Sequence, residues 1–136
     1  MEFSIVDKAD LTEQTCTHIG HIYVSCGWGT AYDWKKIKEA FTNTDYYRIA
    51  INKSKEPIGF IRAFTDNVFA TWLAELVVGK DMQRQGIGTA LLSKFVQDFE
   101  HTAIYLLPLK GTEIFFTRAG LTQRDKLSAH ARRALR

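Results

Sequence analysis

Cysteine and long apolar runs are scarce in this sequence, and each scarcity excludes a class of protein. Only Cys16 and Cys26 are cysteines among the 136 residues. They fall on different turns of one predicted helix, which disfavours a disulfide between them, so free thiols in a reducing compartment are expected. No apolar run approaches the roughly 20 residues that span a bilayer, and the first residues lack the pattern of a signal peptide. We therefore expect a soluble, cytoplasmic protein without membrane contact.

Clustered metal ligands and strong net charge are also missing. His18 and His21 lie one helical turn apart near Cys16, but no further ligands accompany them, so no metal site is expected. The net charge is only +3, and residues 122–136 hold five basic residues and one acidic residue. A basic segment of this kind can contact nucleic acid or an acidic partner, but it is more often a solvated end. Nucleic-acid binding is therefore not expected.

The most informative feature that the sequence does contain is a glycine loop between an apolar run and an amphipathic helix. The run ends at Val78, a polar turn follows, and Gly86 and Gly88 stand where the helix begins. Such a helix start offers free backbone N–H groups and the positive end of the helix dipole to an anion, and glycine lets the backbone come close. The loop matches neither a Walker loop nor the dinucleotide-binding pattern. It predicts a diphosphate site, with a plain strand-to-helix turn as the alternative.

Hydrophobic periodicity predicts the order β-α-α-β-β-β-α-β-α within one domain, residues 1–136. The strands are predicted at 3–6, 46–51, 58–64, 69–78 and 103–107, and the helices at 10–26, 33–41, 86–101 and 112–119. Asp10 to Glu13 has the form of a capping box, and the run at 69–78 is typical of a strand buried on both faces. Residues 128–136 read more like a helix than a strand. The predicted fold class is α/β (α+β), a mixed sheet flanked by helices.

Two segments resemble motifs of one enzyme family. Gln83-x-x-Gly86-x-Gly88 resembles the Q/R-x-x-G-x-G/A motif of the GCN5-related N-acetyltransferases, the GNAT superfamily, where the loop holds the pyrophosphate of acetyl-CoA. Segment 113–121 resembles the A-x-x-F-Y-x-x-x-G-F segment on the family's last helix. Both motifs stand in the family's order, so residues 3–121 resemble a GNAT domain with a shortened C-terminal strand region. The final strand is expected to be missing, or supplied by another subunit of a homodimer.

The resemblance implies direct transfer of an acetyl group from acetyl-CoA to a primary amine in a ternary complex, without a metal. A small-molecule amine is expected rather than a protein. The fourth strand, which bulges in the family, would pair with the pantetheine arm, and the loop would surround the pyrophosphate. The cofactor residues so implied are Leu76, Val77, Val78, Gln83, Arg84, Gln85, Gly86, Ile87, Gly88, Thr89 and Phe116. Arg84 has a surface arginine as its alternative interpretation.

Glu75 is the candidate general base, because it is the only acid inside the apolar run 69–78. A lone carboxylate in a central strand is costly to bury unless it is paired or useful. The alternative is a structural carboxylate paired with Arg62 on the neighbouring strand. The family's frequent tyrosine acid is Phe116 here, so either Tyr105 on the next strand replaces it or solvent protonates the leaving thiolate.

Aromatic residues follow the first helix, where the family binds its acceptor. Trp28, Tyr32 and Trp34 are the predicted acceptor residues, suited to an aromatic or alkyl amine, and cation–π contact with its ammonium is possible. Ordinary core packing is the alternative. The rival function is a non-catalytic acyl-CoA-binding module of a regulatory or toxin type. Phe116 at the tyrosine position favours the rival, whereas Glu75 and the intact glycine loop favour the enzyme.

Overall fold

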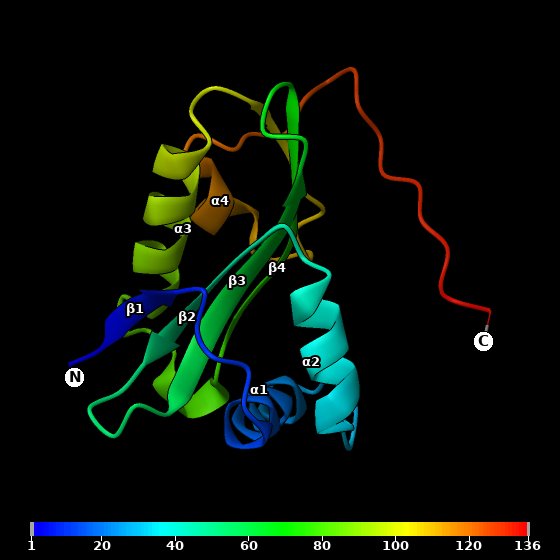
Figure 1. The fold of residues 1–136 in the computed structure, drawn as a ribbon. Coiled ribbons are helices and arrows are strands. Elements are labelled where there is room, and N and C mark those ends of the chain that lie inside the picture. The colour runs from blue at the N-terminus through cyan, green and yellow to red at the C-terminus, as the bar shows by residue number, and fades with distance from the viewer. Residues whose placement is uncertain (1, 136) are drawn as a thin grey trace.

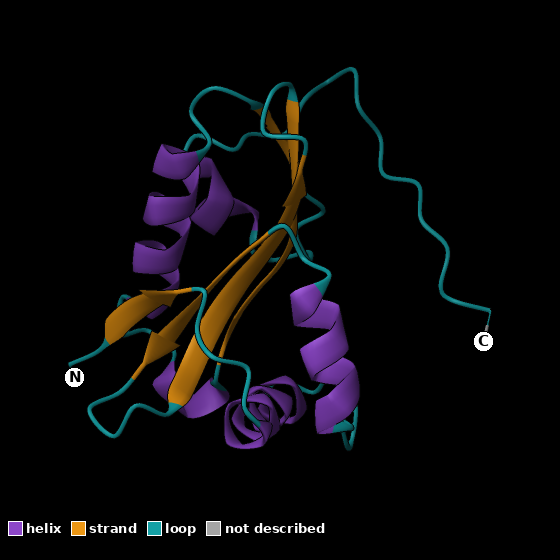
Figure 2. Ribbon diagram, in the orientation of Figure 1, coloured by secondary structure: helices purple, strands orange, loops and turns teal. Residues whose placement is uncertain are grey.

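The computed structural model describes residues 2–135 as a five-stranded sheet between two layers of helices (Figures 1 and 2). The strands are β1 (Ser4–Asp7), β2 (Tyr46–Ile51), β3 (Pro57–Thr65), β4 (Ala70–Val78) and β5 (Ala103–Tyr105). They lie in this order across the sheet, antiparallel except that β4 and β5 are parallel. The helices are α1 (Glu13–Ser25), α2 (Trp34–Thr42), α3 (Ile87–Asp98) and α4 (Glu113–Thr117), with the short 3-10 helix η1 (Lys80–Met82) before α3. The predicted mixed sheet and order of elements are confirmed.

Each face of the sheet carries its own apolar core. On one face α1 and α2 pack around fully buried side chains that include Phe41 and Phe60. On the other face α3 packs around Ile61, Leu91 and Phe95, which are equally buried. Strand residues alternate between the two faces, and each helix turns one apolar stripe inward. The two layers therefore follow directly from the spacing of apolar residues in the sequence.

The first helix begins at a different cap from the one predicted. Thr12, not Asp10, is the N-cap of α1, and its Oγ1 accepts the N–H of Thr15 at 3.1 Å. Leu11 before the cap and Cys16 in the first turns belong to the same apolar cluster. This is the hydrophobic staple that fixes how a chain enters a helix. Burial of Leu11 therefore decides which polar residue caps the helix.

The helix predicted at 128–136 is not formed in residues 128–135, which the structure describes. From residue 122 the chain runs away from the sheet with one turn, in which Leu127 donates its N–H to the Arg124 carbonyl at 3.1 Å (Figure 1). Leu127 and Leu135 are largely exposed, so no apolar face docks this segment. A helix this short is marginal in water without docking. Within the described chain no strand follows β5, which agrees with the shortened strand region.

Two further properties of the described part of the chain bear on the site. No helix in residues 2–135 has the length and apolar character that a membrane crossing requires.

The prediction that β4 is buried on both faces is wrong at one end of the strand, where the Trp72 side chain is exposed. The α1–α2 layer does not extend over that end of the strand (Figure 2).

Candidate active site

A cavity opens where β4 and β5 separate. The two strands pair from Ala70 to Trp72 of β4 and then diverge. β4 bulges just beyond this point, at Ala74, which has no partner on β3. A bulge bends a strand and increases its twist, so it turns β4 away from β5. The cavity has a volume of about 620 Å³, and the bulge that the family resemblance implies is present.

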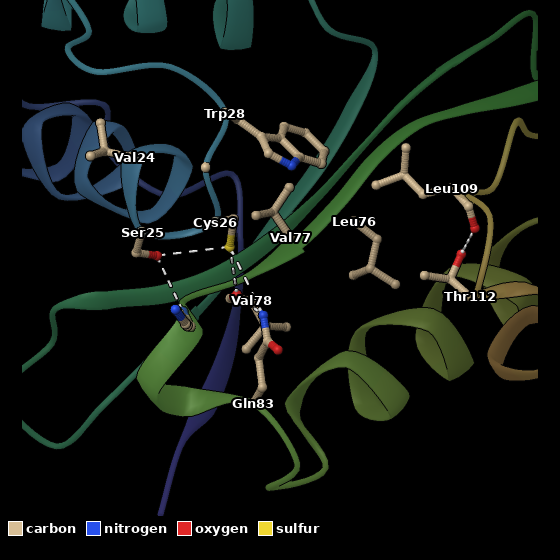
Figure 3. Close-up of a pocket in the computed structure, with 12 residues that line it drawn as sticks. Val24, Ser25, Cys26, Trp28, Leu76, Val77, Val78, Gln83, Leu109 and Thr112 are labelled. Carbon is tan, nitrogen blue, oxygen red and sulfur yellow. Dashed lines mark hydrogen bonds between the residues drawn. The ribbon is translucent and has the colours of Figure 1, made fainter.

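β4 and the segment after β5 form two walls of this cavity, and α4 and the N-terminus of α3 close it. The predicted site residues that line it are Trp28, Glu75, Leu76, Val78, Gln83, Arg84, Gly86, Ile87, Gly88, Thr89 and Phe116. Val77 lines an adjoining cavity of about 580 Å³, which shares Trp28, Leu76, Val78 and Gln83 with the first (Figure 3). Gln85 lines neither and is exposed. The structure thus gathers most of the predicted cofactor residues around one continuous space.

The backbone of β4 presents alternate peptide groups to this space. Gly79 donates its N–H to the carbonyl of Ile58 on β3 at 2.9 Å. Because hydrogen-bonding groups alternate sides along a strand, Val77 also faces β3, whereas Leu76 and Val78 face the opening. The Leu76 N–H is therefore directed at the cavity, where it can bind an oxygen atom.

The carbonyl of Val78 already has partners from two other segments. The Cys26 thiol at the end of α1 donates to it at 3.2 Å, and the Gln83 side-chain amide donates at 3.1 Å. Figure 3 shows both side chains meeting at this carbonyl. Sequence reasoning missed this role of Cys26, because the two residues are 52 positions apart. The contact fixes the end of α1 and the glycine loop against β4.

The N-terminus of α3 supplies free N–H groups to the cavity. Its N-cap is Gly86, in the left-handed region with a φ of 84°, and no side chain caps the helix. The helical ladder begins with the Ala90 N–H to the Gly86 carbonyl at 3.0 Å, so the N–H groups of the three residues between them lack an intrahelical acceptor. Arg84, also left-handed with a φ of 64°, lies beside them. Free N–H groups, the helix dipole and this arginine together suit an anion.

Glu75 lies in a cluster with Arg62 of β3 and Tyr23 of α1. Its Oε1 accepts hydrogen bonds from the Arg62 guanidinium and from the Tyr23 hydroxyl, the latter at 2.7 Å. The side chains of Glu75 and Arg62 are each only 16% exposed. No hydrogen bond from residues 2–135 reaches Oε2, and that oxygen is not buried. The pairing with Arg62 that the structural alternative predicts is therefore present, and it leaves one oxygen of a cavity-lining carboxylate free.

The partners of Glu75 are themselves held in place. Burial raises the pKa of Tyr23, and the charge of Glu75 raises it further, so the tyrosine stays protonated and acts as a donor. Arg62 donates to Thr44 Oγ1 at 3.0 Å, and its guanidinium carbon lies 5.6 Å from the centroid of the Phe41 ring. Sequence reasoning missed Tyr23 as a site residue. The signal was its hydroxyl on an otherwise apolar helix face, since a buried tyrosine hydroxyl usually needs a partner.

The remaining predicted residues lie around the cavity or outside it. Tyr105 does not line it and stacks on Trp72, with ring centroids 6.0 Å apart. Tyr32 stacks on Tyr23 at 4.8 Å, donates its hydroxyl to the carbonyl of Trp28 and lines neither cavity, so it reaches the site through these two residues. Trp34 packs against the α1–α2 core. Phe116 packs against the α3 core and also lines the cavity.

In the described chain, no group of three or more His, Cys, Asp or Glu side chains is arranged to hold a metal ion. The chemistry offered by the cavity is that of a carboxylate, backbone N–H groups and an anion-binding helix end.

Comparison with known proteins agrees with this geometry. The model of the acetyltransferase (GNAT) family matches residues 12–120. No curated protein matches the chain in sequence. A GNAT-family acetyltransferase from Streptococcus pneumoniae TIGR4 superposes with a TM-score of 0.77 at 17% identity, covering 99% of this chain and 100% of its own.

Two other similar structures have named acceptors. Glucosamine-6-phosphate N-acetyltransferase from Arabidopsis thaliana has a TM-score of 0.75 at 7% identity, covering 96% of this chain and 99% of its own. An aminoglycoside acetyltransferase from an uncultured soil metagenomic sample, in complex with sisomicin, has a TM-score of 0.70 at 17% identity, covering 98% and 97%. These structures show the shared fold, and the family model covers most of the chain. The chain belongs to the GNAT acetyltransferase family and is an acyltransferase.

Proposed function

We propose that this protein transfers the acetyl group of acetyl-CoA to the primary amine of a small molecule, by direct attack within a ternary complex. The observation that carries the proposal is the arrangement of Glu75. One of its oxygens is fixed by Arg62 and Tyr23, and the other is free of protein partners beside the cavity where β4 and β5 separate. A carboxylate that is oriented and still accessible is what an amine needs in order to lose a proton.

The cavity supports a specific placement of acetyl-CoA. Its pyrophosphate suits the free N–H groups at the start of α3, with Arg84 adding positive charge. Its pantetheine arm would lie along the open edge of β4, opposite the segment that follows β5. The Leu76 N–H would then meet the thioester oxygen. This placement uses no residue outside the two adjoining cavities.

The chemical step follows from these positions. The ammonium gives a proton to Glu75 Oε2, and the amine nitrogen attacks the thioester carbonyl carbon. The C–N bond forms, and negative charge on the oxygen is stabilised by the Leu76 N–H. The nitrogen, now positively charged, releases its second proton to solvent, and the C–S bond then breaks. Phe116 has no proton to donate and Tyr105 lies outside the cavity, so solvent protonates the departing thiolate.

Two properties of the setting belong to the same proposal. The described thiols, Cys16 and Cys26, are both free, which suits the reducing cytoplasm where acetyl-CoA is available. A homodimer that covers the open edge of β5 is a further prediction. Light scattering on the purified protein tests it independently of activity.

Cofactor binding is tested first, by thermal unfolding with and without CoA. A ligand that binds only the folded state raises the melting temperature by mass action. We expect Arg84→Glu to remove most of this rise, because it places negative charge beside the helix N-terminus. Lys36→Glu, an equal charge change on exposed α2, should leave the rise intact. Loss of the rise in both variants, or in neither, would contradict the assigned anion site.

Transfer is tested by offering acetyl-CoA and a panel of amines and measuring free CoA thiol. Acetylation of at least one small primary amine, lost in Glu75→Gln, is the expected result. A rise in melting temperature with CoA but no turnover on any amine would favour the non-catalytic module instead. Absence of any response to millimolar CoA would overturn the proposal as a whole.

A further inference from the structure

An aromatic row crosses the sheet beside the Arg62–Glu75 pair. Phe64 of β3 lies opposite Trp72 of β4, and Trp72 lies opposite Tyr105 of β5. Directly opposed residues on neighbouring strands point to the same face, so the three rings share one face of the sheet. Since Arg62 is two residues from Phe64 on β3, this is also the face that carries Glu75. The row and the carboxylate therefore lie on the same face of the sheet, two residues apart along β3.

The rings of this row are incompletely covered. Phe64, Trp72 and Tyr105 are 41%, 43% and 39% exposed. In Figure 2, α1 and α2 cover the lower part of this face, and no helix of the described chain covers the upper part, where β4 pairs with β5. Trp72 and Tyr105 stack at an interplanar angle of 23°, and the Arg62 guanidinium carbon lies 6.0 Å from the Phe64 centroid. Contacts within the row thus leave much of each ring open to solvent.

A contiguous exposed apolar patch usually marks a binding site. We infer that this aromatic row binds the apolar body of the acceptor, and that the acceptor is a primary amine carrying an aromatic ring on a short spacer. The inference rests on the proposed function, and it names the substrate class for the same site. It also gives Phe64 and Trp72 a role in specificity. Tyr105, which the sequence suggested as a proton donor, would instead contact the amine that receives the acetyl group.

Charge and spacing select this occupant over a second copy of the chain. The free Oε2 of Glu75 attracts a cation at one end of the surface, and flat rings attract an apolar group at the other. Two residues along a strand span about 7 Å. This is the separation, measured along β3, between the Arg62–Glu75 pair and the aromatic row. An amine with its ring one short spacer from the nitrogen matches that separation. A second copy of the chain packed on the aromatic row would not need a cation beside Glu75.

The test compares three amines as acceptors: phenethylamine, 2-cyclohexylethylamine of similar size, and ethanolamine. We expect the KM for phenethylamine to be at least about tenfold below that for ethanolamine, the scale of one well-placed aromatic contact. The cyclohexyl amine should fall between them. Titration of phenethylamine into the CoA-loaded protein by calorimetry gives a binding readout that does not depend on turnover.

Three variants locate the effect. Trp72→Ala should raise the KM for phenethylamine about tenfold and leave the KM for ethanolamine and for acetyl-CoA unchanged. Trp72→Phe, which keeps a ring, should restore most of the affinity. Ile114→Ala removes an apolar side chain on α4 that is even more exposed, at 68%, and lines neither cavity, and it should change nothing.

The outcomes separate this inference from the proposed function. If ethanolamine is acetylated as well as phenethylamine, or Trp72→Ala leaves both KM values unchanged, the enzyme stands and the aromatic acceptor is wrong. If CoA binds but no amine is acetylated, both fail. If the wild type is a dimer by light scattering and Trp72→Ala is a monomer, the row is a contact between copies and the inference is overturned.

Discussion

A carboxylate held by an arginine and a tyrosine lies on each face of the sheet, and the two carboxylates differ in whether their second oxygen has a partner. On the α3 face, Asp98 Oδ2 accepts from Arg48 at 3.1 Å and from Tyr46 at 2.9 Å, and Oδ1 accepts from Lys94 at 2.9 Å. On the α1 face, Glu75 Oε1 accepts from an arginine and a tyrosine in the same way. There, Oε2 receives no hydrogen bond from residues 2–135.

Their burial is similar, so burial does not explain the difference. The arginine and carboxylate of the Asp98 network are 15% and 21% exposed, against 16% and 16% in the Glu75 network. Asp98 lines neither cavity, whereas Glu75 lines the larger one. A saturated carboxylate joins two elements of the fold, and one with a free oxygen beside a cavity can accept a proton. The comparison predicts that mutation of the first affects stability and that mutation of the second affects turnover.

The largest effect is expected from Glu75→Gln. The amide still accepts from Tyr23 and Arg62 but cannot take a proton, so kcat should fall by about 10²-fold or more. The KM for acetyl-CoA should hardly change, because the cofactor contacts are elsewhere in the cavity. Steady-state rates on the best amine measure both quantities. Normal turnover across the pH range would make Glu75 a structural residue like Asp98.

Asp98→Asn is the matched change in the other network. It weakens the contacts to Arg48 and Lys94 and should cost about 1–3 kcal/mol of unfolding free energy. Turnover per folded molecule should remain at the wild-type level. Asp7→Asn is the control, because Asp7 also pairs with Arg48, at 3.5 Å, but is 56% exposed, and such pairs contribute about 0–1 kcal/mol. Equal losses of unfolding free energy in the two variants would mean that the hydrogen bonds to both oxygens of Asp98 add no more stability than an exposed ion pair.

Acid sharpens the same contrast. Burial tends to raise the pKa of Asp98, but hydrogen bonds from Lys94 and Tyr46 and the charge of Arg48 outweigh it and hold that pKa below its usual value. A lowered pKa in the folded state contributes stability that is complete above the ordinary carboxyl pKa and is lost as the pH falls through the folded value. We therefore expect the urea concentration at the unfolding midpoint to decrease as the pH is lowered below about 4. The decrease should be less steep in Asp98→Asn than in the wild type. Parallel curves would contradict this.

The sequence predicted elements better than contacts between them. Apolar spacing located the strands and helices, and the glycine loop falls beside the cavity as the resemblance implied. The pairing of Arg62 with Glu75 could be predicted from the sequence, because the two residues lie on neighbouring strands. The contact of Tyr23 with Glu75 could not be predicted, because it joins residues 52 positions apart through the packing of α1 on the sheet. The helix expected at 128–136 is not formed over residues 128–135, because this segment has no apolar surface to dock on.

Tyr23→Phe should have an intermediate effect. Burial and the charge of Glu75 raise the pKa of Tyr23, so its role is to donate to Oε1 and to position the carboxylate. Phenylalanine keeps the stacking on Tyr32 and the edge-to-face contact with Phe60 and removes only the hydroxyl. We expect kcat to fall by up to about tenfold, which is the scale of losing one hydrogen bond to a charged group. Steady-state kcat per folded molecule measures this loss, and an unchanged kcat with a lowered melting temperature would make Tyr23 a merely structural residue.

The smallest effect is expected from Phe116→Tyr, which restores the family's frequent tyrosine. Phe116 lines the cavity, so the added hydroxyl can meet solvent or the leaving sulfur, and kcat should be unchanged or rise a few-fold. Phe115→Tyr is the control, because the Phe115 Cζ lies only 3.4 Å from where a Cβ on Gly88 would stand, so a hydroxyl there presses on the start of α3. The control should lose stability without gain in rate. If Phe116→Tyr instead loses about 1–3 kcal/mol that CoA does not restore, its ring faces the core and solvent access to the thiolate must lie elsewhere.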